Sequence, residues 1–75
     1  MTLDQLKIKE KAQIIAIKSD DILKSRLYSF GITKGAVIVM EESTLTKSTI
    51  NIKVNQSKIA LRLNEAQKIE VKYVQ

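Results

Sequence analysis

The segment Thr49-Ile-Asn-Ile-Lys-Val-Asn55 alternates strictly between polar and apolar residues. Successive side chains of a β-strand point to opposite faces of the sheet, so this pattern predicts a strand with one buried and one exposed face. The polar positions are expected to face solvent. The apolar positions, which are expected to point into a hydrophobic core, are Ile50, Ile52 and Val54.

Further strands are predicted around this one. Upstream, residues 36–40 form a dense apolar strand that runs into two glutamates, and the polar residues 43–48 are expected to form a hairpin loop. Downstream, residues 55–57 supply a tight turn into a strand over residues 58–63, and residues 68–74 alternate again. The residues predicted to share one face are Ile59, Leu61 and Leu63 in the first of these two strands and Ile69, Val71 and Tyr73 in the second.

The first predicted strand, over residues 11–18, carries apolar side chains on both of its faces. Ala12 and Ile14 lie on one face, and Ile15 and Ile17 lie on the other. A strand with two apolar faces is typical of a position that is covered on both sides. We therefore expect this strand to be buried between two layers.

A helix is predicted over residues 21–30, directly after that strand. Asp20 and Asp21 stand at its start, where carboxylates cap free N–H groups and complement the helix dipole, so capping explains them better than metal binding does. Apolar residues recur at i, i+4 and i+7 and predict a buried stripe. The residues of this stripe are Leu23, Leu27 and Phe30.

Two glycines and two short helical turns complete the pattern. Gly31 stands where a helix ends in the left-handed conformation, and Gly35 is expected to have a positive φ in the turn before the next strand. Residues 2–5 fit a capping box, which predicts one helical turn whose leucines face inward. A second single turn is predicted over residues 64–67.

Together these elements predict a mostly β fold in which one α-helix follows the first of about five strands. Strands this short cannot bury their apolar faces in a flat sheet that has no partner layer. Curling into a small SH3-like β-barrel, with the helix plugging one end, buries these faces and removes exposed strand edges. A chain of 75 residues is expected to form a single domain over residues 1–75.

The sequence contains no histidine and no cysteine. Ser-His-Asp and Cys-His catalytic arrangements and the usual zinc sites therefore cannot form. The two glycines also lack the Gly-Lys-Ser/Thr sequence of a phosphate-binding loop. We predict no catalytic residue, no cofactor and no tight metal site, and we expect a binding module and not an enzyme.

The net charge of +5 comes from 13 basic and 8 acidic residues. Such a balance favours nucleic acid, an anionic membrane surface or an acidic protein partner, although the basic residues are spread out and a solvated surface explains them too. Base stacking needs exposed aromatic rings, and the chain has only Tyr28, Phe30 and Tyr73. We expect no nucleic-acid partner and keep a nucleic-acid-binding small β-barrel as the alternative function.

The expected location is the cytoplasm. No apolar run approaches the roughly 20 residues that a membrane span requires. The N-terminus also lacks the basic-then-apolar layout of a signal peptide. The chain is therefore expected not to be inserted in a membrane, and the sequence leaves a homo-oligomer open.

Three segments resemble the FeoA (ferrous iron transport protein A) family, in the expected order. Arg26-Leu-Tyr-Ser-Phe-Gly-Ile-Thr-Lys-Gly-Ala-Val-Ile38 resembles the family pattern Arg-Leu-x-x-x-Gly-Leu/Ile-x-x-Gly-x-x-Val/Ile. Leu3-x-x-Leu6 with the later Ala-Gln-Ile-Ile resembles the opening of the family. Ile-Ala-Leu-Arg62 and the later Glu65-Ala-x-x-Ile-x-Val resemble its closing segment. The matching positions that we expect to be structural are Leu27, Gly31, Gly35, Leu61 and Arg62.

The chain departs from the family pattern at three turns. Lys9 stands where the family usually has glycine, and Asn55-Gln56 occupies a second turn where glycine is usual. Asparagine tolerates left-handed geometry, so this second turn can survive. The loop over residues 44–48 lacks the proline and glycine that are often found there. These departures affect loop shapes and not the fold.

The resemblance implies a small cytoplasmic SH3-like protein that acts with a membrane ferrous iron permease. That FeoB-type permease carries a cytoplasmic GTP-binding domain, and its cytoplasmic part is the implied partner. Because this chain lacks imidazole and thiolate ligands, we expect that it does not carry Fe(II) itself. The implied role is therefore to bind and regulate the permease in bacterial iron uptake.

One group of residues is the hypothesised contact surface for the permease. The outer side of the helix and the loop after it combine basic residues with a tyrosine, and Tyr and Arg are enriched at interface hot spots. The alternative is that the lysines are only solvated and that the arginine steadies the helix end. The four residues of this hypothesis are Lys24, Arg26, Tyr28 and Lys34.

Overall fold

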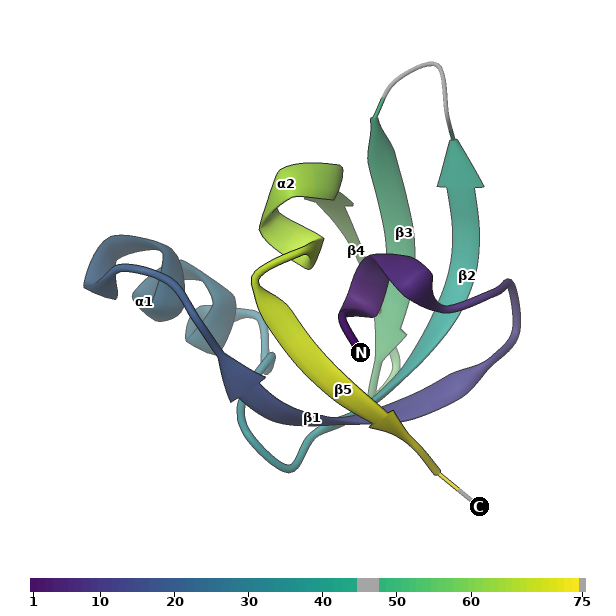
Figure 1. The fold of residues 1–75 in the computed structure, drawn as a ribbon, viewed down its shortest axis with the longest axis horizontal. Coiled ribbons are helices and arrows are strands. Elements are labelled where there is room, and N and C mark those ends of the chain that lie inside the picture. Colours follow the sequence, from purple (N-terminus) through teal and green to yellow (C-terminus); the bar gives the residue numbers. More distant parts are fainter. Residues whose placement is uncertain (45–47, 75) are drawn as a thin grey trace.

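The computed structural model describes residues 1–44 and 48–74, and Figure 1 shows them as a curled sheet with a helix at one side. The five strands have the order β4-β3-β2-β1-β5, and each neighbouring pair is antiparallel. The fold is mostly β with its longer α-helix after the first strand, as predicted. The elements are η1 (Leu3–Gln5, a 3₁₀ helix), β1 (Lys11–Ile17), α1 (Asp21–Ser29), β2 (Val37–Thr44), β3 (Thr49–Val54), β4 (Ser57–Arg62), α2 (Leu63–Ala66) and β5 (Ile69–Tyr73).

The sheet curls but does not close into a complete barrel. Within the described residues, no pairing joins the edge strands β4 and β5. Instead, α2 contacts β4 and η1, and η1 contacts β5, so the two short helical segments bridge the opening. The N-terminus also runs along β5, where the Val71 N–H donates to Met1 O over 2.8 Å. α1 lies to one side of the curled sheet in Figure 1 and buries Leu27 in the core.

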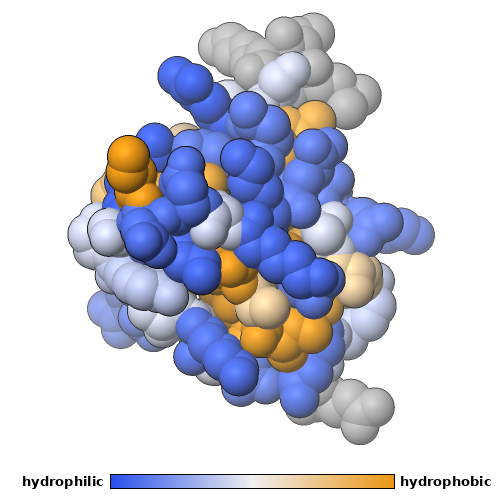
Figure 2. All heavy atoms as spheres, turned by 60° about the vertical axis from the view of Figure 1, so that its left-hand side comes forward, coloured by the Kyte–Doolittle hydropathy of each residue, from blue (hydrophilic) through white to orange (hydrophobic). Residues whose placement is uncertain are grey.

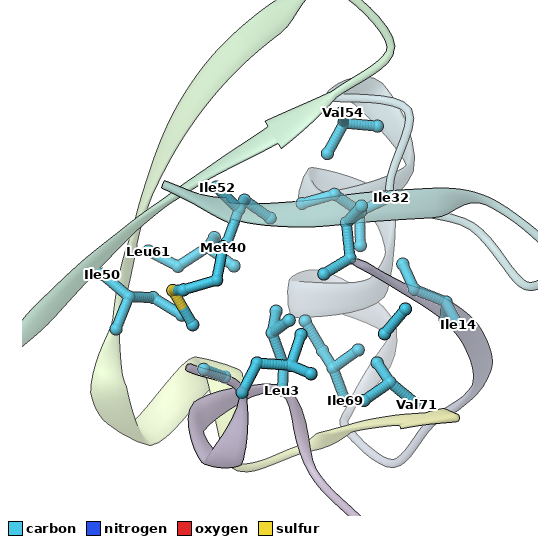
Figure 3. Close-up of a cluster of buried hydrophobic side chains, with 14 of the residues drawn as sticks. Leu3, Ile14, Ile32, Met40, Ile50, Ile52, Val54, Leu61, Ile69 and Val71 are labelled. Atoms are coloured by element: carbon cyan, nitrogen blue, oxygen red, sulfur yellow. The ribbon is translucent and has the colours of Figure 1, made fainter. Parts of the chain in front are cut away.

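The hydrophobic core fills the inner side of the curled sheet (Figure 3). Ile50, Ile52 and Val54 are at most 2% exposed, which confirms the orientation predicted from their strict alternation. Leu27 anchors α1 to this core and is fully buried. The other buried apolar residues are Leu3, Leu6, Ala12, Ile14, Ile32, Ile38, Met40, Leu61, Ala66, Ile69 and Val71.

β1 is covered on one face only, and the prediction of two covered faces is wrong. Ala12 and Ile14 are buried, but Ile15 is 36% exposed. A register shift between Ile14 and Ala16 places Ile15 at a β-bulge in the pairing with β5. Its side chain meets solvent because the outer side of the sheet has no covering layer in the described part of the chain.

Two aromatic residues at the ends of elements are exposed. Phe30 is 43% exposed and Tyr73 is 55% exposed. α1 ends at Ser29, so Phe30 is the C-cap residue and lies beyond the buried part of the apolar stripe. Tyr73 is the last residue of β5. The prediction that Phe30 is buried is wrong, because α1 ends one residue before it. Tyr73 shares a side with Val71, as predicted, and lies opposite the buried Ala12, but the core does not extend to it.

Two element boundaries also differ from the prediction. β2 continues to Thr44, past the predicted end at residue 40, so it takes in the start of the predicted loop over residues 43–48. Residues 45–47 of that loop lie outside the described residues. Leu63 opens α2 instead of closing β4. The backbone N–H of Arg62 donates to Glu65 Oε1 over 3.0 Å, and this cap starts α2 one residue before the predicted turn.

The ends of α1 follow the prediction. Asp20 Oδ1 accepts a backbone N–H three residues on, over 2.8 Å, and so caps the helix. Gly31 has φ 86° and Gly35 has φ 93°, a region that glycine occupies at low steric cost. The N–H of Ile32 reaches back to Leu27 O over 3.0 Å, a bond that a left-handed residue at position 31 allows.

Replacing Gly31 by valine should lower the free energy of unfolding by at least about 1 kcal/mol, because a β-branched residue is strained at positive φ. A Cβ at position 31 would meet Val54 Cγ1 at 3.6 Å, an ordinary contact, so backbone strain sets the cost. Gly31→Asn is the matched control and should lose less, because asparagine tolerates this conformation. Urea unfolding measures the difference. Equal midpoints for Gly31→Val and the unchanged chain would contradict this helix end.

Lys9 also has a left-handed backbone, with φ 72°. Lys9→Gly should raise the free energy of unfolding by about 0.5–1 kcal/mol, because the left-handed cost for a non-glycine residue exceeds the entropy that glycine loses on folding. The control is Lys7→Gly in the same connection, at a residue without a positive φ; it should be neutral or destabilising. Thermal and urea unfolding compare them. A Lys9→Gly protein that is less stable than the unchanged chain refutes the strain argument.

Candidate partner-binding site

α1 and its C-cap carry three large side chains that face solvent. Ile22 is 83% exposed, Tyr28 is 50% exposed and Phe30 is 43% exposed. The helix has nine residues and is too short to be stable alone, so it depends on packing through the buried Leu27 and the half-buried Leu23. Figure 2 brings this side of the molecule forward. A short helix held by one side leaves its other sides free to contact a partner.

The four residues of the predicted contact surface do not form one surface. An α-helix turns by about 100° per residue, so Lys24 and Tyr28, four residues apart, share a side of α1. Arg26 is two residues from Tyr28 and lies on the opposite side. Lys34 is exposed in the connection that follows α1. The structure therefore brings Lys24 and Tyr28 together and separates Arg26 from both.

Arg26 instead joins α1 to α2. Its Nη2 lies 2.7 Å from Glu65 Oε2, and the Glu65 side chain is only 10% exposed. The second carboxylate oxygen of Glu65 accepts the backbone N–H of Arg62 over 3.0 Å. A nearly buried carboxylate is costly unless it is paired and hydrogen-bonded, and these two contacts satisfy it. This geometry favours a structural role for Arg26.

Sequence reasoning missed Glu65 as the partner of Arg26. The two residues are far apart along the chain, and no local periodicity connects a helix to a strand–helix junction. Glu65 does stand three residues after Arg62, which is capping spacing, but that signal concerns α2 alone. Ile22 was also missed. Its position off the predicted apolar stripe is the signal that could have identified it as exposed.

A shallow groove runs between α1 and α2. Ile22 and Arg26 line it from α1, and Arg62 and Lys68 line it from the other side. Neither Arg62 nor Lys68 forms an ion pair with another described residue. The expected structural residues Leu27 and Leu61 are buried, whereas the side chain of Arg62 faces solvent at the start of α2. The groove thus combines an exposed apolar residue with two free positive charges.

Glu70 of β5 has a shifted pKa. Lys18 Nζ lies 2.8 Å from Glu70 Oε1. The hydrogen bond from Lys18 and its positive charge lower the pKa of the Glu70 carboxyl. The Lys18 side chain is 69% exposed and the Glu70 side chain is 33% exposed, so solvent screens the pair and it contributes little to stability. It connects β5 to the segment between β1 and α1.

Within residues 1–44 and 48–74, no group of three or more acidic side chains is placed to hold a metal ion. No helix in these segments is long and apolar enough to cross a membrane.

The chain matches the sequence model of the FeoA domain over residues 1–73. It is 40% identical over 74 residues to a Helicobacter pylori J99 protein named as an Fe(2+) transport protein A, covering 96% of this chain and 94% of that protein. It is similar to the solution structure of FeoA from Chlorobium tepidum, with a TM-score of 0.93 and 24% identity, covering 100% of this chain and 71% of that one.

A third similar protein is FeoA of Stenotrophomonas maltophilia, which was crystallised with zinc. The TM-score is 0.82 at 25% identity, covering 96% of this chain and 89% of that one. That protein is described as an SH3 domain protein and is suggested to act as an activating factor of ferrous iron transport. The SH3-like architecture predicted from the sequence is confirmed by this similarity, with the difference that the sheet here stays open.

The Arg26–Glu65 contact should be measurable in a double-mutant cycle. Arg26→Met should lower the free energy of unfolding by about 1 kcal/mol, because it leaves a nearly buried carboxylate without its charged partner. Arg26→Met combined with Glu65→Gln should cost less than the sum of the single changes. The control is Lys24→Met, on the other side of α1, which should be nearly neutral. If the effects of the two single changes are additive, the coupling free energy between Arg26 and Glu65 is zero and the contact does not stabilise the fold.

Proposed function

Because the chain belongs to the FeoA family, we propose that it is a cytoplasmic accessory protein of ferrous iron uptake that binds the cytoplasmic part of a FeoB-type GTPase permease. The names of its relatives support a role in Fe(2+) transport. The observation that carries the proposal of a binding role is the exposure of Ile22, Tyr28 and Phe30 on one short helix.

α1 has the composition of a contact surface. Tyr28 has a large ring whose burial yields much contact area at a small cost in side-chain entropy, and residues of this kind dominate interface energies. Lys24 adds a positive charge on the same side of the helix, and Lys34 adds another beyond its C-terminal end. This combination fits an acidic surface of the permease that has an apolar centre. We therefore place the permease contact on Lys24, Tyr28 and Lys34.

The chemistry of the side chains supports a regulatory role over a carrier role. Fe(II) in proteins is commonly held by imidazole, thiolate or clustered carboxylate ligands. The sequence supplies no histidine or cysteine, and its carboxylates at Asp20 and Glu65 are used as helix caps or ion-pair partners. In this proposal the permease moves the ion, and this chain acts on the permease.

The contact is tested by the double variant Lys24→Glu/Tyr28→Ala. It removes the ring and reverses the charge on one side of α1 without touching Leu27, so folding should survive. Binding to detergent-solubilised permease should weaken by about tenfold or more, because losing an interface hot spot costs at least about 2 kcal/mol. Biolayer interferometry measures the affinity, and circular dichroism checks the fold.

The matched control is Lys72→Glu/Tyr73→Ala, which makes the same chemical changes on two exposed residues of β5. This control should bind the permease like the unchanged chain. If both double variants weaken permease binding equally, the loss comes from the change in net charge and not from the α1 surface. Unchanged binding of the folded α1 variant would move the contact away from this helix.

A further inference from the structure

The outer face of the sheet carries lysines from neighbouring strands in one cross-strand row. Lys11 of β1 lies opposite Val39 of β2, Val39 lies opposite Lys53 of β3, and Lys53 lies opposite Lys58 of β4. Residues that lie opposite one another in an antiparallel pair point to the same face. The alternate positions of these strands are buried in the core. The row therefore lies on the solvent side.

A further lysine comes from β5. Lys72 lies opposite Gln13, which is two residues from Lys11 and so shares its face. Three of the lysines are exposed, and Lys53 is half-buried. The residues Lys11, Lys53, Lys58 and Lys72 are called the lysine face below.

The positive charges of the lysine face are not neutralised within the described part of the chain. None of its lysines forms an ion pair with another described residue. Two carboxylates at its borders are engaged elsewhere: Glu70 pairs with Lys18, and Glu42 accepts a hydrogen bond from Asn51 over 3.4 Å. Lys58 shares a shallow groove with Glu41 and Glu42. The uncompensated charge is therefore greatest over β5, β1 and β3.

Apolar side chains lie among these lysines. Val37 lies opposite Gln13 and is 40% exposed. Ile15 follows two residues after Gln13 on β1 and is 36% exposed. Val74, which is 38% exposed, continues the line from Lys72 and donates its N–H to Lys11 O over 3.3 Å. Figure 2 shows apolar surface gathered in the lower half of the view and flanked by hydrophilic side chains.

We propose that this outer face docks onto the surface of an anionic lipid bilayer. Its lysines would meet the lipid headgroups, and Val37, Ile15 and Val74 would enter the interfacial layer. The argument is charge complementarity: each lysine near an anionic membrane is attracted without a fixed hydrogen-bond geometry, and apolar side chains between lysines add interfacial burial. The inference rests on the proposed function, since a protein that acts on a membrane permease works beside such a surface.

Two other anionic partners fit the face less well. Single-stranded nucleic acid binds through aromatic rings as well as charge, and the lysine face contains no aromatic residue. Tyr73 lies opposite Ala12, on the inner row of the sheet. Protein interface hot spots are enriched in Tyr, Trp and Arg, and the lysine face contains none of these, whereas α1 carries Tyr28. A fluid layer of lipid anions needs neither feature.

The test is co-sedimentation of the full chain with vesicles that contain no permease. Vesicles of phosphatidylcholine with about 30% phosphatidylglycerol provide the anionic surface, and pure phosphatidylcholine vesicles provide the neutral one. Binding is expected on the anionic vesicles only, and it should fall when the salt is raised from about 0.05 M to about 0.5 M. Folded protein that stays in the supernatant at low salt overturns the proposal.

The double variant Lys11→Glu/Lys72→Glu tests the placement of the contact. Anionic-vesicle binding should weaken about thirtyfold or more, because each lysine at such a surface changes partitioning by about fivefold. The control Lys7→Glu/Lys24→Glu has the same net charge, since 5 − 4 = +1 for both variants, and should retain most of the binding. Equal loss in the two variants overturns the lysine face as the site. If the glutamate variant does not fold, Lys11→Gln/Lys72→Gln replaces it.

Two further measurements separate this inference from its rivals. A single-stranded RNA that binds through Lys11 and Lys72 while anionic vesicles do not bind would assign the face to nucleic acid. Lys11→Glu/Lys72→Glu should bind detergent-solubilised permease as the unchanged chain does, because α1 is intact. Loss of vesicle binding with intact permease binding supports two separate surfaces. Failure of vesicle binding leaves the permease proposal standing, because the vesicles contain no permease.

Discussion

A single sheet must bury its apolar face without a second layer, and the chain does this by curling the sheet and sealing the gap with its two shortest helical segments. Leu3 of η1 and Ala66 of α2 are fully buried at the side where β4 and β5 fail to pair. Burying one leucine side chain contributes about 1.5–3 kcal/mol, whereas a single core of this size supplies a net stability of roughly 3–5 kcal/mol. The fold therefore depends on residues outside its regular strands.

Glu65 connects this seal to the one exposed helix. Its carboxylate accepts the Arg62 N–H that starts α2 and the Arg26 guanidinium of α1. The same residue thus fixes the end of β4, the position of α2 and one side of α1. Since Leu27 holds α1 by its apolar stripe and Arg26 holds it by charge, the side with Lys24 and Tyr28 is left free. The exposed surface of α1 is a consequence of how its other sides are anchored.

Local sequence patterns correctly predicted the parts of the fold in which apolar residues are buried and polar residues are exposed. The alternation around Ile52, the glycine after α1 and the Asp20 cap each specify a conformation through nearest neighbours, and the structure has them. Ile15, Phe30 and Tyr73 are apolar yet exposed, because burial depends on where layers and element ends fall in three dimensions. Hydropathy cannot show that a sheet has only one covered face.

In the candidate site, too, sequence patterns could not show contacts between residues that are far apart along the chain. The helix period identified Lys24 and Tyr28 as neighbours, but it could not show that Arg26 has a partner on α2, since Glu65 is distant in sequence. Register was also needed to see that Lys11 and Lys53 share a face, because lysines spread evenly along a chain look like ordinary solubilising charge. The pairing of neighbouring strands brings these dispersed lysines together on one face of the sheet.

Two apolar residues that were expected to be buried, Ile15 and Phe30, lie on the two surfaces for which partners are proposed. Phe30 belongs to the end of α1, and Ile15 belongs to the outer face of β1. Single exposed apolar side chains are common on protein surfaces, but Ile15 lies with Val37 among the lysines, and Phe30 follows Tyr28 at the end of α1. Grouped exposure of this kind is typical of contact surfaces. If the outer face holds the chain at a bilayer, a permease in the same bilayer meets α1 at a raised effective concentration. A small and individually weak contact on α1 then suffices, which fits a helix of nine residues with few anchoring groups of its own.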